Sequence, residues 1–122
     1  MREYGKKVWM IPDCFCPAVS TVGKSHDAIC VLNTTGCPAE IRLTLYFEDR
    51  DKFTLKSSCP PEATHHIRMD RITDAEGREI PRDVPYAVLV ESSCPVVVQY
   101  SRLDTSLGNE ALMTTIAYPV EE

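Results

Sequence analysis

In the segment Glu40-Ile41-Arg42-Leu43-Thr44-Leu45-Tyr46-Phe47, apolar side chains occupy every second position from Ile41 to Phe47. A period of two places these side chains on one face of a β-strand and their neighbours on the other face. The segment therefore predicts a strand with one buried face.

Seven further runs of strand-forming residues lie on either side of this segment, at a spacing of about ten residues. They are Lys7–Ile11, His26–Leu32, Lys52–Lys56, Thr64–Met69, Tyr86–Glu91, Val96–Leu103 and Leu112–Tyr118. The pattern predicts an all-β fold, an antiparallel β-sandwich or jelly roll. We expect less than about 15% helix, with single turns at 70–77 and 106–111.

Proline supports this interpretation, since it is excluded from central strand positions. Seven of the nine prolines are expected at or just outside the ends of the runs. These are Pro12, Pro17, Pro38, Pro60, Pro61, Pro95 and Pro119.

Length and charge restrict the class of protein. The chain has 122 residues, which predicts a single domain over 1–122, and its formal net charge of -5 disfavours a nucleic-acid surface. The first residues carry charges without the apolar run of a signal peptide, and no apolar stretch approaches the ~20 residues of a membrane-spanning helix. We therefore expect a cytoplasmic protein.

Six cysteines are the unusual feature of the composition, and in the cytoplasm they are expected to be free thiols. Cys-Pro steps at 16, 37, 59 and 94 leave open a thiol or haem redox sensor. However, the one-residue spacing of Cys14-Phe15-Cys16 does not fit a zinc knuckle, and adjacent His65 and His66 point to opposite faces of a strand. No metal site, cofactor or enzymatic activity is expected.

The strongest candidate for a binding site is the polar run that follows the apolar strand Val96-Val97-Val98. It contains Gln99, Arg102 and Asp104, and it delivers polar groups to the rim of the sandwich. Arginine offers a planar fork of donors that suits carboxylates, phosphates or vicinal hydroxyls. An ion pair between Arg102 and Asp104 is the competing structural interpretation.

Taken together, the runs resemble one family, the cyanobacterial sensory rhodopsin transducers. The resemblance extends from about Val8 to Tyr118 and rests on many short blocks in the same order. The blocks are Trp9, Ser25–Asn33, Ile41–Phe47, His66-Ile67-Arg68, Ile80-Pro81, Pro95–Gln99, Ser101–Asp104, Asn109–Leu112 and Thr115–Tyr118. The Cys-rich loop Asp13–Pro17 departs from the family, for which we expect a glycine-rich loop.

The resemblance implies a sandwich similar to carbohydrate-binding domains, assembled as a homotetramer and without enzymatic activity. It implies sensing of a small molecule such as a sugar, through polar positions and an aromatic ring. Carried over residue by residue, these positions are Trp9, His26, Asn33, Arg68, Gln99, Arg102 and Asp104. The alternative is an adaptor that docks on a membrane photoreceptor, a sensory rhodopsin, and relays its signal.

Overall fold

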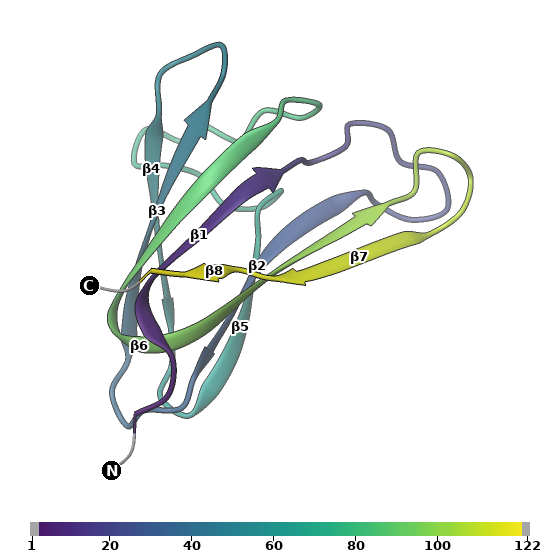
Figure 1. Cartoon of the computed structure of the whole chain (residues 1–122). Coiled ribbons are helices and arrows are strands. Elements are labelled where there is room, and N and C mark those ends of the chain that lie inside the picture. Colours follow the sequence, from purple (N-terminus) through teal and green to yellow (C-terminus); the bar gives the residue numbers. More distant parts are fainter. Residues whose placement is uncertain (1–2, 121–122) are drawn as a thin grey trace.

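The computed structural model describes residues 3–120, and the described chain is all-β (Figure 1). Its strands are β1 (Lys6–Cys14), β2 (His26–Asn33), β3 (Ala39–Phe47), β4 (Phe53–Cys59), β5 (Ala63–Arg68), β6 (Tyr86–Asp104), β7 (Ala111–Ile116) and β8 (Tyr118–Pro119). No helix in this part of the chain is long and apolar enough to cross a membrane. The expected single helical turns at 70–77 and 106–111 are hydrogen-bonded turns and bends instead.

The strands form two antiparallel sheets that share β6. The first sheet has the order β4-β3-β6-β1-β8, and the second has the order β5-β2-β6-β7. The predicted antiparallel sandwich is confirmed. Ile41, Leu43 and Leu45 of β3 are buried, as their alternation predicts, and Phe47 packs against the same core.

Strand β6 corrects the sequence interpretation, because the two runs expected at Tyr86–Glu91 and Val96–Leu103 are one strand of 19 residues. Its first part pairs with β1 and β3, and its second part pairs with β2 and β7. Figure 1 shows the strand turning back on itself, so that both of its ends lie at one end of the sandwich. We call that end the open rim and the other end, where β6 bends, the closed end.

Two prolines lie inside strands, where the sequence interpretation excluded them. Pro95 falls at the bend of β6, between the last pair with β3 at Ser92 and the first pair with β2 at Val97. Pro12 lies in β1 within a register shift between Ile11 and Cys14. Both positions agree with the rule that proline in a sheet occurs where a ladder hydrogen bond is not required.

In contrast to β6, the single run expected at Leu112–Tyr118 forms two strands, β7 and β8, which the buried Ala117 separates. The Ala117 amide donates to the Val98 carbonyl at 3.0 Å. Strand β7 pairs with β6 in the second sheet, whereas β8 pairs with β1 in the first. The chain therefore changes sheets here, which leaves β7 at an edge of the second sheet.

Candidate ligand site at the open rim

The open rim contains a buried carboxylate, Asp27, at the start of β2. Its side chain is 0% exposed, and its Oδ2 accepts hydrogen bonds from the Tyr86 hydroxyl at 2.5 Å and the Tyr100 hydroxyl at 2.8 Å. Tyr86 begins β6 in the first sheet, whereas Tyr100 lies near its end in the second. Asp27 therefore joins the two sheets where they open.

Burial controls the protonation of this cluster. It raises the pKa of Asp27, although the hydrogen bonds from Tyr86 and Tyr100 and the charge of Arg102 act in the opposite direction. Burial, together with the charge of Asp27, also raises the pKa of both tyrosines. The two hydroxyls therefore keep their protons at neutral pH and act as donors.

Arg102 stands beside Asp27, as its cross-strand partner between β6 and β2. Its side chain is 20% exposed, and its Nη2 lies 3.8 Å from Oδ1 of Asp13. Its guanidinium carbon lies 5.7 Å from the ring centre of Phe15 and 5.6 Å from that of Tyr100. These two rings and the Asp13 carboxylate hold the donor fork of Arg102 at the rim.

Two polar atoms at this place are buried without a hydrogen-bond partner among residues 3–120. They are Oδ1 of Asp27 and Nη2 of Arg102. Buried polar atoms nearly always have a partner, so each such atom calls for an explanation. One of the two atoms is a hydrogen-bond acceptor and the other a donor, and they belong to cross-strand partners on β2 and β6.

Two other predicted residues, His26 and Asp104, share the rim with Arg102. His26 Nδ1 lies 2.9 Å from the Lys24 carbonyl oxygen, and Asp104 accepts a hydrogen bond from the Ser106 amide at 2.8 Å. The hydrogen bonds with Ser106 lower the pKa of Asp104. No ion pair between Arg102 and Asp104 occurs in the described chain, which removes the competing structural interpretation of that pair.

The expectation that Trp9 lies at a binding surface is wrong, because the structure places this residue in the core. Its side chain is 5% exposed, and its indole N–H donates to the carbonyls of Lys6 at 3.0 Å and Val96 at 3.1 Å. A buried ring offers no open face, so the expected stacking of Trp9 on a sugar does not occur in this fold.

Asn33 is also placed inside the fold, at the closed end. Its Nδ2 donates to the carbonyls of Cys37 at 2.8 Å, Pro60 at 3.1 Å and Cys59 at 3.3 Å. Its Oδ1 accepts from the amide and the hydroxyl of Thr35. These bonds use the whole amide to tie the β2–β3 connection to the β4–β5 connection, so Asn33 has a structural role here.

Arg68 lies at the rim end of β5, opposite Ala28 of β2, and forms a two-pronged ion pair with Asp70 at 2.8 and 2.9 Å. Gln99 lies away from the rim, opposite Cys30 of β2, where it is exposed and its amide donates to the Thr114 hydroxyl of β7. Of the seven predicted residues, the structure therefore places His26, Arg102 and Asp104 together, with Arg68 at the same end of the sandwich but paired with Asp70.

Sequence reasoning missed Asp27, Tyr86 and Tyr100 as parts of this site. A signal for Tyr100 was available, because it continues the inward-facing series that begins with Val96 and Val98. A buried tyrosine needs a partner for its hydroxyl, which predicts a polar group opposite it. Nothing in the sequence indicated that Tyr86 would meet the same group from the other sheet.

The cysteines at the rim do not favour a redox or haem function. Cys14 and Cys16 are buried, and burial raises the pKa of both thiols, that of Cys16 to about 11. Thiols that stay protonated are poor nucleophiles and poor metal ligands. Within residues 3–120, no three His, Cys, Asp or Glu side chains are grouped so that they could hold a metal ion.

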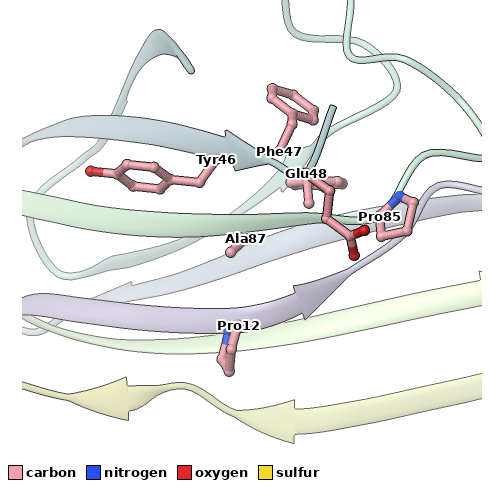
Figure 2. A pocket seen from close by; sticks show the side chains of 7 residues that line it. Pro12, Tyr46, Phe47, Glu48, Pro85 and Ala87 are labelled. Atoms are coloured by element: carbon pink, nitrogen blue, oxygen red, sulfur yellow. The ribbon is translucent and has the colours of Figure 1, made fainter. Parts of the chain in front are cut away.

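A separate, largely apolar surface covers the outer face of the first sheet. A cavity of about 230 Å³ is lined there by residues such as Pro12, Tyr46 and Ala87, and Figure 2 shows Ala87 between Tyr46 and Pro12. A neighbouring cavity of about 350 Å³ also contains Met10 and Tyr118. No predicted site residue lines either cavity.

Comparison with known proteins agrees with this architecture. A crystal structure described as Thermotoga maritima 1070 is 36% identical, with a TM-score of 0.87, over 96% of this chain and 97% of that chain. The structure of the Anabaena sensory rhodopsin transducer is 27% identical, with a TM-score of 0.75, over 84% of this chain and 92% of that chain. No curated protein matches the chain significantly.

The family comparison covers almost the whole chain. A family model described as Anabaena sensory rhodopsin transducer matches residues 4–119. This range contains all eight strands and the complete open rim. The chain therefore belongs to the sensory rhodopsin transducer family.

Proposed function

We propose that this chain is a signal-transduction protein that senses a small polar molecule, such as a sugar or a sugar acid, at the open rim. It acts by binding, without catalysing a reaction. The observation that carries the proposal is the pair of buried atoms that lack a hydrogen bond among residues 3–120, Nη2 of Arg102 and Oδ1 of Asp27. They belong to cross-strand neighbours, so one ligand can contact both side chains.

The scaffold around these atoms favours binding of this kind. Asp27 is fixed by two tyrosine hydroxyls, and Arg102 is fixed between two rings and a carboxylate. Groups that are already ordered lose little conformational entropy when a ligand arrives. Arg102 supplies donors for carboxylate or hydroxyl oxygens, and Asp27 accepts a hydrogen bond from a hydroxyl.

A thermal-shift screen of neutral sugars and sugar acids tests the proposal. A ligand that binds only the folded state stabilises it by RT ln(1 + [L]/Kd), so the melting temperature rises with the logarithm of ligand concentration once that exceeds Kd. We expect at least one compound with vicinal hydroxyls to raise the melting temperature in this concentration-dependent manner. If none of the sugars and sugar acids does so, the proposed sensing function is wrong.

The second candidate function is docking on a partner protein, which includes the sensory rhodopsin implied by the family. Strand β7 favours this function, because all six of its residues are exposed. Its apolar members Leu112, Met113 and Ile116 are 73%, 42% and 63% exposed, respectively. An exposed apolar edge strand is a typical surface for pairing with another chain.

The same strand supports a proposed homo-oligomer, with a tetramer as the expected form. Edge strands and exposed apolar side chains are buried when copies of one chain assemble with closed symmetry. Receptor docking and self-assembly can use different parts of the surface that β7 and the apolar outer face of the first sheet provide. Arg102 is the cross-strand partner of Met113 in β7, so assembly through β7 would take place beside the rim site.

A further inference from the structure

A groove between the edge strands β4 and β5 carries a concentration of positive charge that the rim site does not explain. It has a volume of about 410 Å³ and lies on the side where the two sheets are not joined by a shared strand. Five of its eight lining residues are basic and none is acidic: Lys56, His65, His66, Arg68 and Arg71, with Ser57, Ile67 and Ile72 completing the wall. This composition stands out in a chain of net charge -5.

Local structure fixes the position of these basic groups. His65 of β5 binds the Ser58 carbonyl of β4 through Nδ1 at 2.6 Å, which joins the two walls of the groove. A turn closed by the Arg71 amide and the Arg68 carbonyl, at 3.1 Å, places two arginines at one end of it. The groove is therefore formed by two strands and a turn whose relative positions are fixed by hydrogen bonds.

The carboxylate that pairs with Arg68, Asp70, does not neutralise this end of the groove. Its side chain is 0% exposed and lies within 4 Å of three cations: Arg68 at 2.8 Å, Lys24 at 3.5 Å and Arg82 at 3.8 Å. Burial raises the pKa of Asp70, but the hydrogen bonds and charge of Arg68 outweigh it and lower the pKa overall. One negative charge among three positive ones leaves the region cationic.

Arg71 and Lys56 lie on the groove without an ion pair in the described part of the chain. The pair with Asp70 uses Nε and Nη2 of Arg68, so Nη1 remains outside that pair. Arg71, Lys56 and Nη1 of Arg68 can therefore donate hydrogen bonds to a ligand in the groove. The wall of the groove also includes Ile67 and Ile72. The cations provide charge and donors, and the isoleucines provide an apolar floor.

We propose that this groove binds the phosphate group of a small phosphorylated molecule. Arginine and lysine together match the charge and the acceptor oxygens of a phosphate monoester. The volume is in the range of sites for small ligands, and the apolar floor suits the carbon part of such a molecule. Neither Asp27 nor Arg102 lines the groove, and the groove adds a second ligand class to the proposed sensing function.

Calorimetric titration with inorganic phosphate, at constant ionic strength held with chloride, tests the groove. We expect saturable binding to the full chain, weakened by about fivefold or more in Arg71→Ala and in Lys56→Ala. Lys52→Ala is the matched control, because it removes the same charge from an exposed side chain near Tyr46 and outside the groove. Glycerol phosphate should bind like inorganic phosphate, and glycerol should not bind.

The proposal is overturned if phosphate does not bind beyond the chloride control. It is also overturned if Lys52→Ala weakens binding as much as Arg71→Ala does, since the effect is then one of overall charge. Circular dichroism of each variant confirms that it is folded. Arg102→Ala should leave phosphate binding unchanged, so failure of the rim proposal and failure of this one give different results.

Discussion

Asp27 and Asn33 are two fully buried polar residues at opposite ends of β2. Asn33 uses all its hydrogen-bonding groups on protein partners, so it contributes to the fold and has nothing left for a ligand. Asp27 uses one carboxylate oxygen and leaves the other without a partner among the described residues. That difference, and not burial, separates a structural polar residue from a candidate binding residue.

The raised pKa of Asp27 predicts how stability depends on pH. The folded state binds the Asp27 proton more tightly than the unfolded state does, where the pKa is about 3.9. This stabilisation is fully present below the unfolded pKa, and it is lost as the pH rises through the higher pKa of the folded state. The free energy of unfolding of the wild type, minus that of Asp27→Asn, should therefore fall over this range.

Urea denaturation at a series of pH values measures this difference. Asp104→Asn is the control, because the pKa of Asp104 is lowered by its hydrogen bonds with Ser106. Its stabilisation is present above the unfolded pKa and lost as the pH falls, so the difference for that variant should change with the opposite sign. A difference for Asp27→Asn that stays flat or rises with pH would show that burial does not dominate at Asp27.

At the scale of elements, β6 is the strand on which the molecule is built. The sequence could predict its two halves from their apolar residues, but Pro95 made them look like two strands. Pairing explains the difference, because no register pair falls on Pro95 where β6 passes from one sheet to the other. A pattern along one chain reports which face is buried, but not that a strand continues through a bend.

The close approach at this bend predicts the effect of Gly5→Ala. Gly5 has a φ of +92°, and an added Cβ would overlap the carbonyl of Val96. Gly77→Ala is the matched control, since Gly77 has a φ of +82° with nothing within 4 Å of the added Cβ. We expect Gly5→Ala to lower the free energy of unfolding by about 2 kcal/mol more than Gly77→Ala does.

Denaturant unfolding of the two variants gives this comparison directly. Both substitutions have the same backbone cost for positive φ, so the difference isolates the overlap with Val96. Equal losses of stability would mean that β1 shifts away from the bend without cost.

The candidate site was predictable in part, for reasons that lie in the same elements. Arg102 and Asp104 lie at the end of a strand whose apolar first residues can be recognised in the sequence. Their position at the rim could therefore be predicted from that strand. The prediction for Trp9 failed because an indole ring occurs both in protein cores and at binding surfaces. Its burial here depends on hydrogen bonds from the indole N–H to the carbonyls of Lys6 and Val96, which the sequence does not show. Tyr86 and Asp27 meet across two sheets, and no local pattern contains that contact.

At the scale of the whole molecule, the exposed strand β7 predicts self-association. Light scattering of the wild type should give a multiple of the 13.7 kDa chain mass, with a tetramer expected. The double variant Leu112→Lys with Ile116→Lys should dissociate, because two charges replace apolar side chains that are 73% and 63% exposed in the single chain.

Leu107→Lys is the control for this test, since Leu107 is 90% exposed but precedes the strand. It should leave the mass of the wild type unchanged. A wild type that scatters as a monomer at micromolar concentration, or a double variant that keeps the full mass, would contradict assembly through β7.

Different parts of the sandwich carry the different proposed roles. Strand β6 bends at the closed end, the exposed strand β7 is the proposed contact surface, and the open rim is the proposed sensing site. Asp27 connects the two sheets at the rim through Tyr86 and Tyr100. We therefore expect a ligand bound at Asp27 and Arg102 to alter how the two sheets are held together.

Calorimetric titration of Arg102→Ala, with a compound that raises the wild-type melting temperature, tests whether the rim is a binding site. We expect a variant with the wild-type circular dichroism spectrum and mass, but with binding weakened by at least ~1 kcal/mol, the scale of a hydrogen bond to a charged group. A variant that binds the compound as tightly as the wild type does, or one that unfolds or falls to monomers, would contradict it.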